Sequence, residues 1–262
     1  DTIYNDNSSG DYSVIYAYGG NDSIYFYDGD YVTINAGDGN DTVNGWYYSS
    51  KIYGGEGADF MSINGSFYSN TIDGGDDNDT IYARGGSING GAGSDRISLI
   101  PDSYSQATIK AGTGNDTIYG SSLTSYGILY QYANGDGNDL IYNWNSNDTI
   151  NLGGATYTKS ISNGNVILGV GSSSITLSGA SDKTVNVTNG TLSITGGQYI
   201  SSINSYSTIY GTSYNDTIYP VSGGGDYSAI YAYGGNDSIY FYDGDYVSIY
   251  AGDGNDTVNG WY

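Results

Sequence analysis

The feature that most constrains this 262-residue chain is a short turn motif that recurs ten times. Each copy is a Gly-rich turn followed by Asp, then by a short strand-forming segment with an aliphatic residue two places after the Asp. We number the motif positions one to nine, so that Ala36 is position one and Asp41 is position six of the copy at 36–44. The other clearest copies lie at 54–62, 90–98, 111–119 and 134–142.

These turns have the chemistry of a calcium site. Glycine allows a tight turn with positive φ, so that carbonyl oxygens can point at a common centre. The Asp at position six adds a carboxylate, and oxygen ligands of this kind suit calcium better than other common ions. Seven of these Asp residues follow one another at intervals of 16 to 23 residues. The regular recurrence predicts a solenoid with metal between its coils.

The charge of the chain supports the same interpretation. The net charge is −22, with only six Lys or Arg residues, and such repulsion normally opposes a compact state. However, 15% of the residues are aromatic, and Ile and Val recur at regular places. We therefore expect a fold that is completed by bound cations, which neutralise the acids along one edge.

Composition also excludes several classes of function. The chain has no Cys and no His, which excludes disulfides, zinc thiolate sites, Ser-His-Asp triads and Cys-His dyads within it. Nucleic-acid binding is disfavoured because phosphate contacts need basic residues. No apolar run approaches the roughly 20 residues of a membrane span. Paired carboxylates are too numerous to single out an active site, so we expect no enzyme activity.

Each coil is predicted to contain two strands. One follows the Gly-Asp turn, and the second lies about halfway to the next turn, at 31–35, 50–53, 70–73, 86–89 and 107–110. Side chains alternate along a strand, so one aliphatic row should point inward from each of two parallel sheets. The two predicted rows are Ile24, Val43, Met61, Ile81, Ile97, Ile118 and Ile141, and Ile34, Ile52, Ile72, Ile88 and Ile109.

A long-range duplication divides the chain. Residues 226–262 repeat residues 11–47 with three changes, at an offset of 215 residues. We expect a β-roll at 1–147 and a β-rich module without the calcium motif at 148–206, which either caps the roll or continues it without metal. The start of the next β-roll unit follows at 207–262. The near-identity of the two copies predicts tandem units of about 215 residues.

The turns resemble the hemolysin-type calcium-binding repeat of the RTX family, GGxGxDxUx, in which U is a large aliphatic residue. The resemblance covers about 1–151 and 207–262 and implies a calcium-bound parallel β-roll, an all-β solenoid, interrupted here by the hairpin module. It implies side-chain ligands at Asp22, Asp41, Asp59, Asp79, Asp95, Asp116, Asp139, Asp216, Asp237 and Asp256. It implies carbonyl ligands at Gly37, Gly39, Gly55, Gly57, Gly91, Gly93, Gly112, Gly114, Gly135, Gly137, Gly252 and Gly254.

The chain departs from the family pattern in two ways. The motif comes once per coil instead of every nine residues, which predicts calcium along one edge only. At position four, Asp77 and Tyr214 replace glycine, so the sites of Asp79 and Asp216 are expected to differ in geometry.

The resemblance implies export from bacteria by type I secretion and folding in extracellular calcium. We expect a structural protein that forms an extracellular fibre or adhesin stalk, with further units of the same chain as partners and Ca²⁺ as its ligand. The alternatives are the calcium-folding and secretion region of a larger RTX enzyme or toxin, and a module that binds surface polysaccharide. The chain has 32 tyrosines, which fit either packing between strands or stacking on sugar rings. Four of them are predicted to face outward: Tyr25, Tyr82, Tyr119 and Tyr142.

Overall fold

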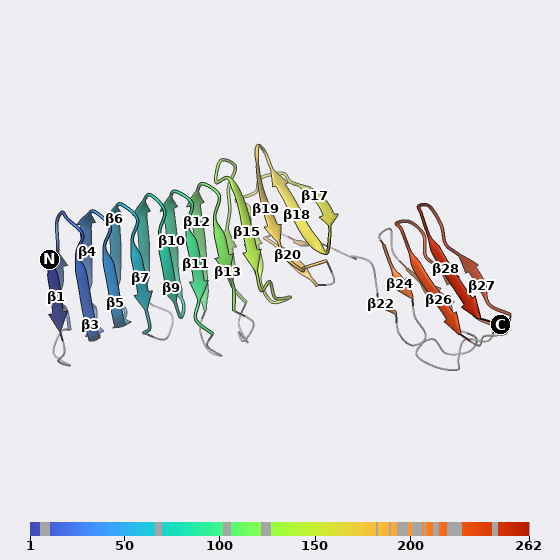
Figure 1. Cartoon of the computed structure of the whole chain (residues 1–262), viewed down its shortest axis with the longest axis horizontal. Coiled ribbons are helices and arrows are strands. Elements are labelled where there is room, and N and C mark those ends of the chain that lie inside the picture. Colours follow the sequence, from blue (N-terminus) through green and yellow to red (C-terminus); the bar gives the residue numbers. More distant parts are fainter. Residues whose placement is uncertain are drawn as a thin grey trace. The chain divides into compact units, whose positions relative to one another are not determined.

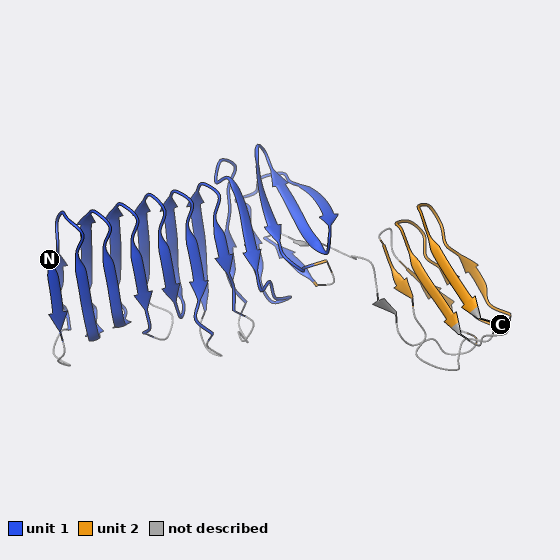
Figure 2. Cartoon of the chain, in the orientation of Figure 1, with its two compact units in different colours: residues 1–180, 184–192 blue, residues 181–183, 193–262 orange. Residues whose placement is uncertain are grey.

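The protein is an all-β solenoid throughout its described part. The computed structural model describes residues 1–5, 11–65, 70–101, 106–121, 127–181, 183–188, 190–192, 199–200, 206, 208–211, 215–218, 227–242 and 246–261. The chain divides into two compact units, one of residues 1–180 and 184–192 and one of residues 181–183 and 193–262 (Figure 2). Every element in the described ranges is a β-strand, which confirms the predicted fold class.

The first unit consists of two parallel sheets whose strands alternate along the chain, so that each coil, or rung, gives one strand to each sheet (Figure 1). The first sheet runs through β1 (Thr2–Asn5), β3 (Ser23–Asp30), β5 (Thr42–Tyr48), β7 (Phe60–Ile63), β9 (Thr80–Ala83), β11 (Arg96–Leu99), β13 (Thr117–Tyr119) and β15 (Asn138–Tyr142). The second runs through β2 (Val14–Tyr16), β4 (Thr33–Asp38), β6 (Lys51–Glu56), β8 (Thr71–Asp76), β10 (Gly86–Ala92), β12 (Ala107–Thr113), β14 (Leu129–Gln131) and β16 (Thr149–Asn151).

The aliphatic residue at position eight sets the register of the first sheet. Ile24 pairs with Val43, Val43 with Met61, and Met61 with Ile81, and each is fully buried. Ile34, Ile52 and their equivalents stack in the same way in the second sheet. Both predicted inward rows are therefore confirmed. Tyr130 takes the place of the aliphatic residue in β14 and is also buried.

The core is deeper than one aliphatic row per sheet. A second row, two residues further along the first sheet, contains Phe26, Ile63, Ala83 and Leu99, all of them buried. The Tyr47 ring packs against Phe26 with ring centroids 6.2 Å apart. The motif analysis did not include this row, because its residues lie in the same strands two places after position eight and so just beyond the nine-residue motif.

The parallel stack ends in antiparallel strands. In the first sheet β15 pairs in parallel with β19 (Ser173–Leu177), which is followed by antiparallel β18 (Asn165–Val170) and β17 (Thr158–Ser162). In the second sheet β16 pairs in parallel with β20 (Val185–Val187), which is followed by antiparallel β21 (Gly190–Leu192). Strands β19 and β20 thus add one more rung without the calcium motif. Residues 182, 189, 193–198 and 201–205 of the predicted 148–206 module lie outside the described residues.

The second unit repeats the start of the first. One of its sheets contains β22 (Tyr199–Ile200), β24 (Thr217–Ile218), β26 (Ser238–Tyr242) and β28 (Thr257–Trp261), and the other β23 (Thr208–Tyr210), β25 (Ala229–Tyr231) and β27 (Ser248–Tyr250). Ile218 pairs with Ile239 as Ile3 pairs with Ile24, so the duplicated sequence has the same register in both units. Within the described residues there is no long apolar helix of the kind that crosses a membrane.

The glycine at position two allows neighbouring rungs to approach closely. A methyl group on Gly112, where φ is +111°, would lie 1.9 Å from the carbonyl oxygen of Gly91 in the preceding rung. Gly135 occupies the same motif position one rung later, with φ +102°, but a methyl group there meets nothing within 4 Å. The two glycines therefore separate the effect of backbone conformation from that of rung spacing.

We expect Gly112→Ala to destabilise the protein more than Gly135→Ala. The Gly135 variant has only the strain of a left-handed residue, about 1–2 kcal/mol. The Gly112 variant has the same strain and must also push two rungs apart. Urea unfolding of both variants in saturating calcium measures the difference. Equal losses of stability would mean that close rung packing at position two contributes nothing.

Candidate metal centre

All described copies of the turn share one backbone geometry. Positions two and four have positive φ, for example +111° at Gly37 and +123° at Gly39. Asp77 takes φ 74° at position four, so it adopts the same left-handed region as the glycines it replaces. Tyr18 takes φ 72° at position two, a substitution that the motif analysis missed. Tyr214 lies outside the described residues.

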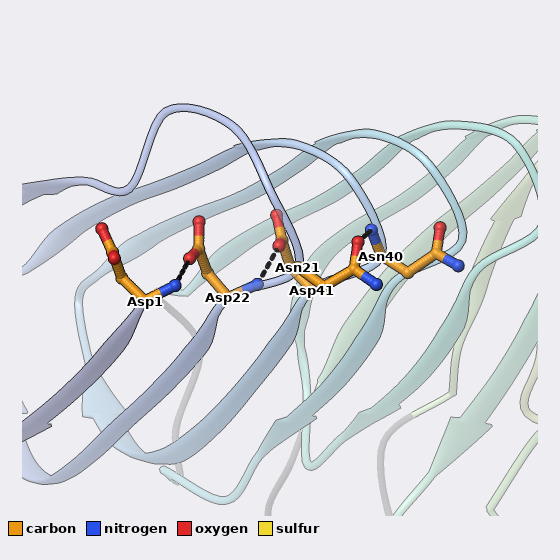
Figure 3. Close-up of polar contacts among 5 residues, drawn as sticks. All are labelled: Asp1, Asn21, Asp22, Asn40 and Asp41. Atoms are coloured by element: carbon orange, nitrogen blue, oxygen red, sulfur yellow. Dashed lines mark hydrogen bonds and ion pairs between the residues drawn. The ribbon is translucent and has the colours of Figure 1, made fainter.

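The position-six aspartates form a continuous row along one edge of each unit, which we call the aspartate ladder (Asp22, Asp41, Asp59, Asp79, Asp95, Asp116 and Asp139 in the first unit; Asp216, Asp237 and Asp256 in the second). The backbone N–H of each ladder residue donates to the Oδ1 atom of the next, as from Asp22 to Asp41 at 2.7 Å (Figure 3). The equivalent distances are 2.8 Å from Asp41 to Asp59 and 2.8 Å from Asp59 to Asp79. The ladder therefore ties successive rungs together.

The second carboxylate oxygen of most ladder residues is buried without a hydrogen bond. These orphan Oδ2 atoms belong to Asp22, Asp41, Asp59, Asp79, Asp95, Asp116 and Asp237. A buried carboxylate oxygen that lacks a donor is costly unless a cation neutralises it. Because the orphan atoms recur once per rung on one edge, they fit a row of bound cations.

Burial raises the pKa of the ladder carboxylates. The pKa is about 7 for Asp59, about 8 for Asp79, about 6 for Asp95 and about 8 for Asp139, against an ordinary value of 3.8. Desolvation is the largest cause in each case, and the charge of neighbouring ladder residues adds to it. The hydrogen bond to Oδ1 acts in the opposite direction. The ionised ladder is therefore unfavourable by itself and becomes favourable beside a cation.

A carbonyl at position one converges with the orphan oxygen. The place where a methyl group on Gly54 would lie is 2.2 Å from Asp59 Oδ2 and 2.3 Å from the carbonyl oxygen of Gly74, position one of the next rung. Gly74 has the same relation to Asp79 Oδ2 and to the carbonyl of Gly90. Oxygen atoms of two rungs thus meet beside a glycine that leaves the space open.

The predicted glycine carbonyls occupy a different place. The carbonyl oxygen of Gly37 lies 2.0 Å from the place that a methyl group on Gly55 would occupy. The carbonyl oxygen of Gly39 lies 2.4 Å from the place that a methyl group on Gly57 would occupy. The carbonyls of Gly55, Gly91, Gly93 and Gly114 face the glycines of their next rungs in the same way. These carbonyls lie between rungs along the turn, whereas the position-one carbonyls lie at the carboxylates. The frequent Gly or Ala at position one was the sequence signal that could have pointed to the position-one carbonyls.

Carbonyl oxygens are needed for any metal site at this edge. In the described part of the chain, no three acidic side chains come together to form a metal site by themselves. One carboxylate and several carbonyls per rung match the oxygen-rich shell of Ca²⁺, which takes six to eight oxygen ligands. The residues present therefore fit calcium, held by the ladder carboxylates and turn carbonyls of adjacent rungs. The bound ion would neutralise the orphan oxygens.

Sites at the ends of the ladder differ. Asp256 is partly exposed, whereas Asp216 and Asp237 are buried. Asp139 lies against the last rung, which has Ser174 and Ile175 of β19 beside it instead of another Asp turn. We therefore expect the interior sites of each ladder to be the best formed.

A second ladder, formed by position five, was not predicted. The backbone N–H of Asn40 donates to Asn21 Oδ1 at 2.9 Å (Figure 3). The backbone N–H of Ala58 donates to Asn40 Oδ1 at 3.0 Å. The same contact joins Asn138 to Asn115 and Asn255 to Asn236. It runs in the direction opposite to the aspartate ladder. The frequent Asn directly before the motif Asp was the signal that could have revealed it.

Comparison with known proteins agrees with this geometry. The RTX calcium-binding nonapeptide repeat, a family described by four copies of the repeat, matches residues 9–32, 28–46, 35–62, 62–87, 107–122, 207–219 and 246–261. The chain carries RTX calcium-binding repeats. Asp95, Asp139 and Asp237 lie outside the matched segments of this RTX repeat, yet the ladder includes them with the same hydrogen bonds.

Other comparisons add little. The solved structure of the extracellular lipase LipA from Serratia marcescens matches the RTX chain with a TM-score of 0.35 and 18% sequence identity. The match covers 59% of this chain and 38% of the lipase chain. No function follows from similarity at that level. No curated protein sequence matches the chain.

The raised pKa values predict how the metal-free RTX chain responds to pH. The folded ladder binds more protons than the unfolded chain between about pH 4 and pH 8. Stability without metal should therefore be greatest at the low end of this range and fall as pH rises through it. Circular dichroism in excess chelator at pH 5 and pH 8 measures this. More β-structure at pH 8 than at pH 5 would contradict the prediction.

Proposed function

We propose that this chain is a secreted structural segment whose β-roll folds on binding calcium outside the cell and serves as a rod or stalk. RTX repeats bind calcium and occur in proteins secreted by bacteria. The observation that carries the proposal is the duplication at an offset of 215 residues, because both copies have the same rungs and register. Near-identical units suit an extended tandem array, in which repeated length is the useful property.

Calcium supplies the coupling between export and folding. Before export, the low calcium concentration leaves the ladder carboxylates repelling one another, and the chain stays unfolded. Outside the cell, millimolar calcium neutralises them and closes the rungs, so that binding free energy becomes folding free energy. We assign no catalysis to this segment. The array acts through its length and its outer faces.

Electron microscopy of the native material tests the proposal. Long unbranched rods that shorten or disappear in chelator are expected. If the same gene instead encodes a catalytic domain next to a few such units, and no rods are seen, the chain is the calcium-folding region of a larger RTX protein. Calcium would then serve secretion and folding without forming a fibre.

A further inference from the structure

The outer face of the first sheet differs in charge from the rest of the chain. We call it the arginine face and define it by the outward residues of the first-sheet strands β5 to β15 together with Arg84, which directly follows β9. Both arginines of the chain, Arg84 and Arg96, lie on it. Among the described outward residues of these strands there is no Asp or Glu, although the chain contains 28 acidic residues. The acids lie instead at the turns, on the other sheet and at the end of β3, where Asp30 pairs with Tyr48 of β5.

Arg96 is held in place by two tyrosines. Its guanidinium carbon lies 4.2 Å from the centroid of the Tyr119 ring, a cation–π contact. Hydrogen bonds to Tyr119 and Tyr82 raise its pKa, while the side chain stays exposed to solvent. A guanidinium has five N–H donors in a planar fork, so donors remain for a ligand. Arg96 is therefore a fixed cation with a free edge.

Exposed aromatic rings lie on the same face. Phe60 is 41% exposed, and its ring centroid is 5.7 Å from that of Tyr82. Trp46 is 43% exposed and has the Arg84 guanidinium carbon 5.6 Å from its ring centroid. Short polar side chains, Thr42, Asn44, Ser62 and Thr80, lie between these rings on the same face. The face thus offers cations, ring faces and hydrogen-bonding groups over several rungs.

This combination selects a class of partner. Two fixed guanidinium groups on a surface without acids favour carboxylates, which arginine binds in a bidentate manner. Exposed rings beside hydroxyl and amide groups favour flat, partly apolar and hydroxylated units. Nucleic acid fits less well because its closely spaced phosphates need many basic contacts, and the chain has only six Lys or Arg residues. A uronic acid polysaccharide has both sugar rings and moderately spaced carboxylates.

We propose that the arginine face binds an acidic polysaccharide, with carboxylates on Arg84 and Arg96 and sugar rings against Phe60 and Trp46. This binding goes beyond the proposed rod function and rests on it only in needing the calcium-folded roll. It makes the rod itself adhesive, so that each unit holds an acidic glycan along its length. Calcium contributes a second time, because the ions reduce the overall negative charge that would repel the glycan.

The test is calorimetric titration of the full chain with oligogalacturonate in saturating calcium, with circular dichroism on the same samples. We expect binding that weakens as salt rises. The variant Arg84→Gln with Arg96→Gln should bind about tenfold more weakly or worse, because charge-assisted hydrogen bonds are lost. The matched control is Lys51→Gln with Lys110→Gln, which removes the same charge from the second sheet and should bind like the wild type.

A further variant separates stacking from charge. Phe60→Thr places at this position the residue that β5, β9 and β13 already have there, so the rung should tolerate it. It should weaken binding several-fold without changing the salt dependence. Polyglutamate and single-stranded poly-dT serve as anionic ligands without sugar acids, and both should bind more weakly than oligogalacturonate.

The outcomes are distinct. If the chain is folded and loaded with calcium but does not bind oligogalacturonate, the proposed glycan binding by the arginine face is wrong and the rod function is unaffected. Equal losses for the arginine and lysine variants, or equal binding of polyglutamate and poly-dT, also overturn it by indicating unspecific attraction. A chain that stays unfolded in calcium overturns the proposed function and this face with it.

Discussion

Chelation of calcium is expected to abolish the β-structure of both units, and added calcium is expected to restore it. Seven orphan carboxylate oxygens are buried along the ladders, and each ladder residue carries a like charge one rung from the next. Without an ion, either the carboxylates must be protonated or the rungs must separate. At neutral pH we expect separation, seen as loss of the β signal in far-ultraviolet circular dichroism.

The size of the effect follows from linkage. Calcium at 100 times its Kd adds about 2.7 kcal/mol per site, and the total stability of a domain is about 5–15 kcal/mol. Three sites would therefore contribute about 8 kcal/mol, which is as large as the whole stability of a typical domain. Magnesium is the control, since it keeps its water ligands and prefers a strict octahedral shell. A β signal that is unchanged in excess chelator at neutral pH would contradict the assignment of the ladder as a metal site.

The second prediction concerns the charge of two ladder residues. Replacing Asp59 and Asp79 by Asn keeps an oxygen that can accept the Oδ1 hydrogen bond of the ladder but removes both carboxylates. In saturating calcium the double variant should lose about 5 kcal/mol, the contribution of two sites. In chelator it should be more stable than the wild type, because two buried like charges are gone. The sign of the effect should thus reverse with metal.

The control uses acids of the same two turns. Glu56 and Asp76 occupy position three, pair with each other across adjacent rungs, and are exposed. Replacing them by Gln and Asn removes the same charge and should change stability by about 0.5 kcal/mol or less in either condition. Urea unfolding in calcium, together with the β signal that remains in chelator by circular dichroism, compares both variants with the wild type. A control variant that loses as much calcium-dependent stability as the ladder variant would assign the ions to position three instead.

Much of the rung could be predicted from local sequence. The aliphatic residue at position eight indicated the inward rows, because side chains alternate along a strand whatever surrounds it. Glycine at positions two and four indicated left-handed turns, because conformations with positive φ are intrinsic to glycine. The recurring Asp indicated one oxygen-rich edge. Each of these properties depends on a few neighbouring residues, so the sequence alone was enough.

Contacts between rungs were decided only by the tertiary structure. The N–H of Asp22 meets the carboxylate of Asp41, and Arg96 meets Tyr119, across loops of variable length that motif spacing does not describe. The convergence of the Gly74 carbonyl with Asp59 Oδ2 likewise needs the register of two rungs. Tyr18 and Asp77 adopt left-handed φ against their own preference because the rungs on either side impose it. Local propensity determines the shape of a rung, whereas the neighbours packed against it determine which atoms meet.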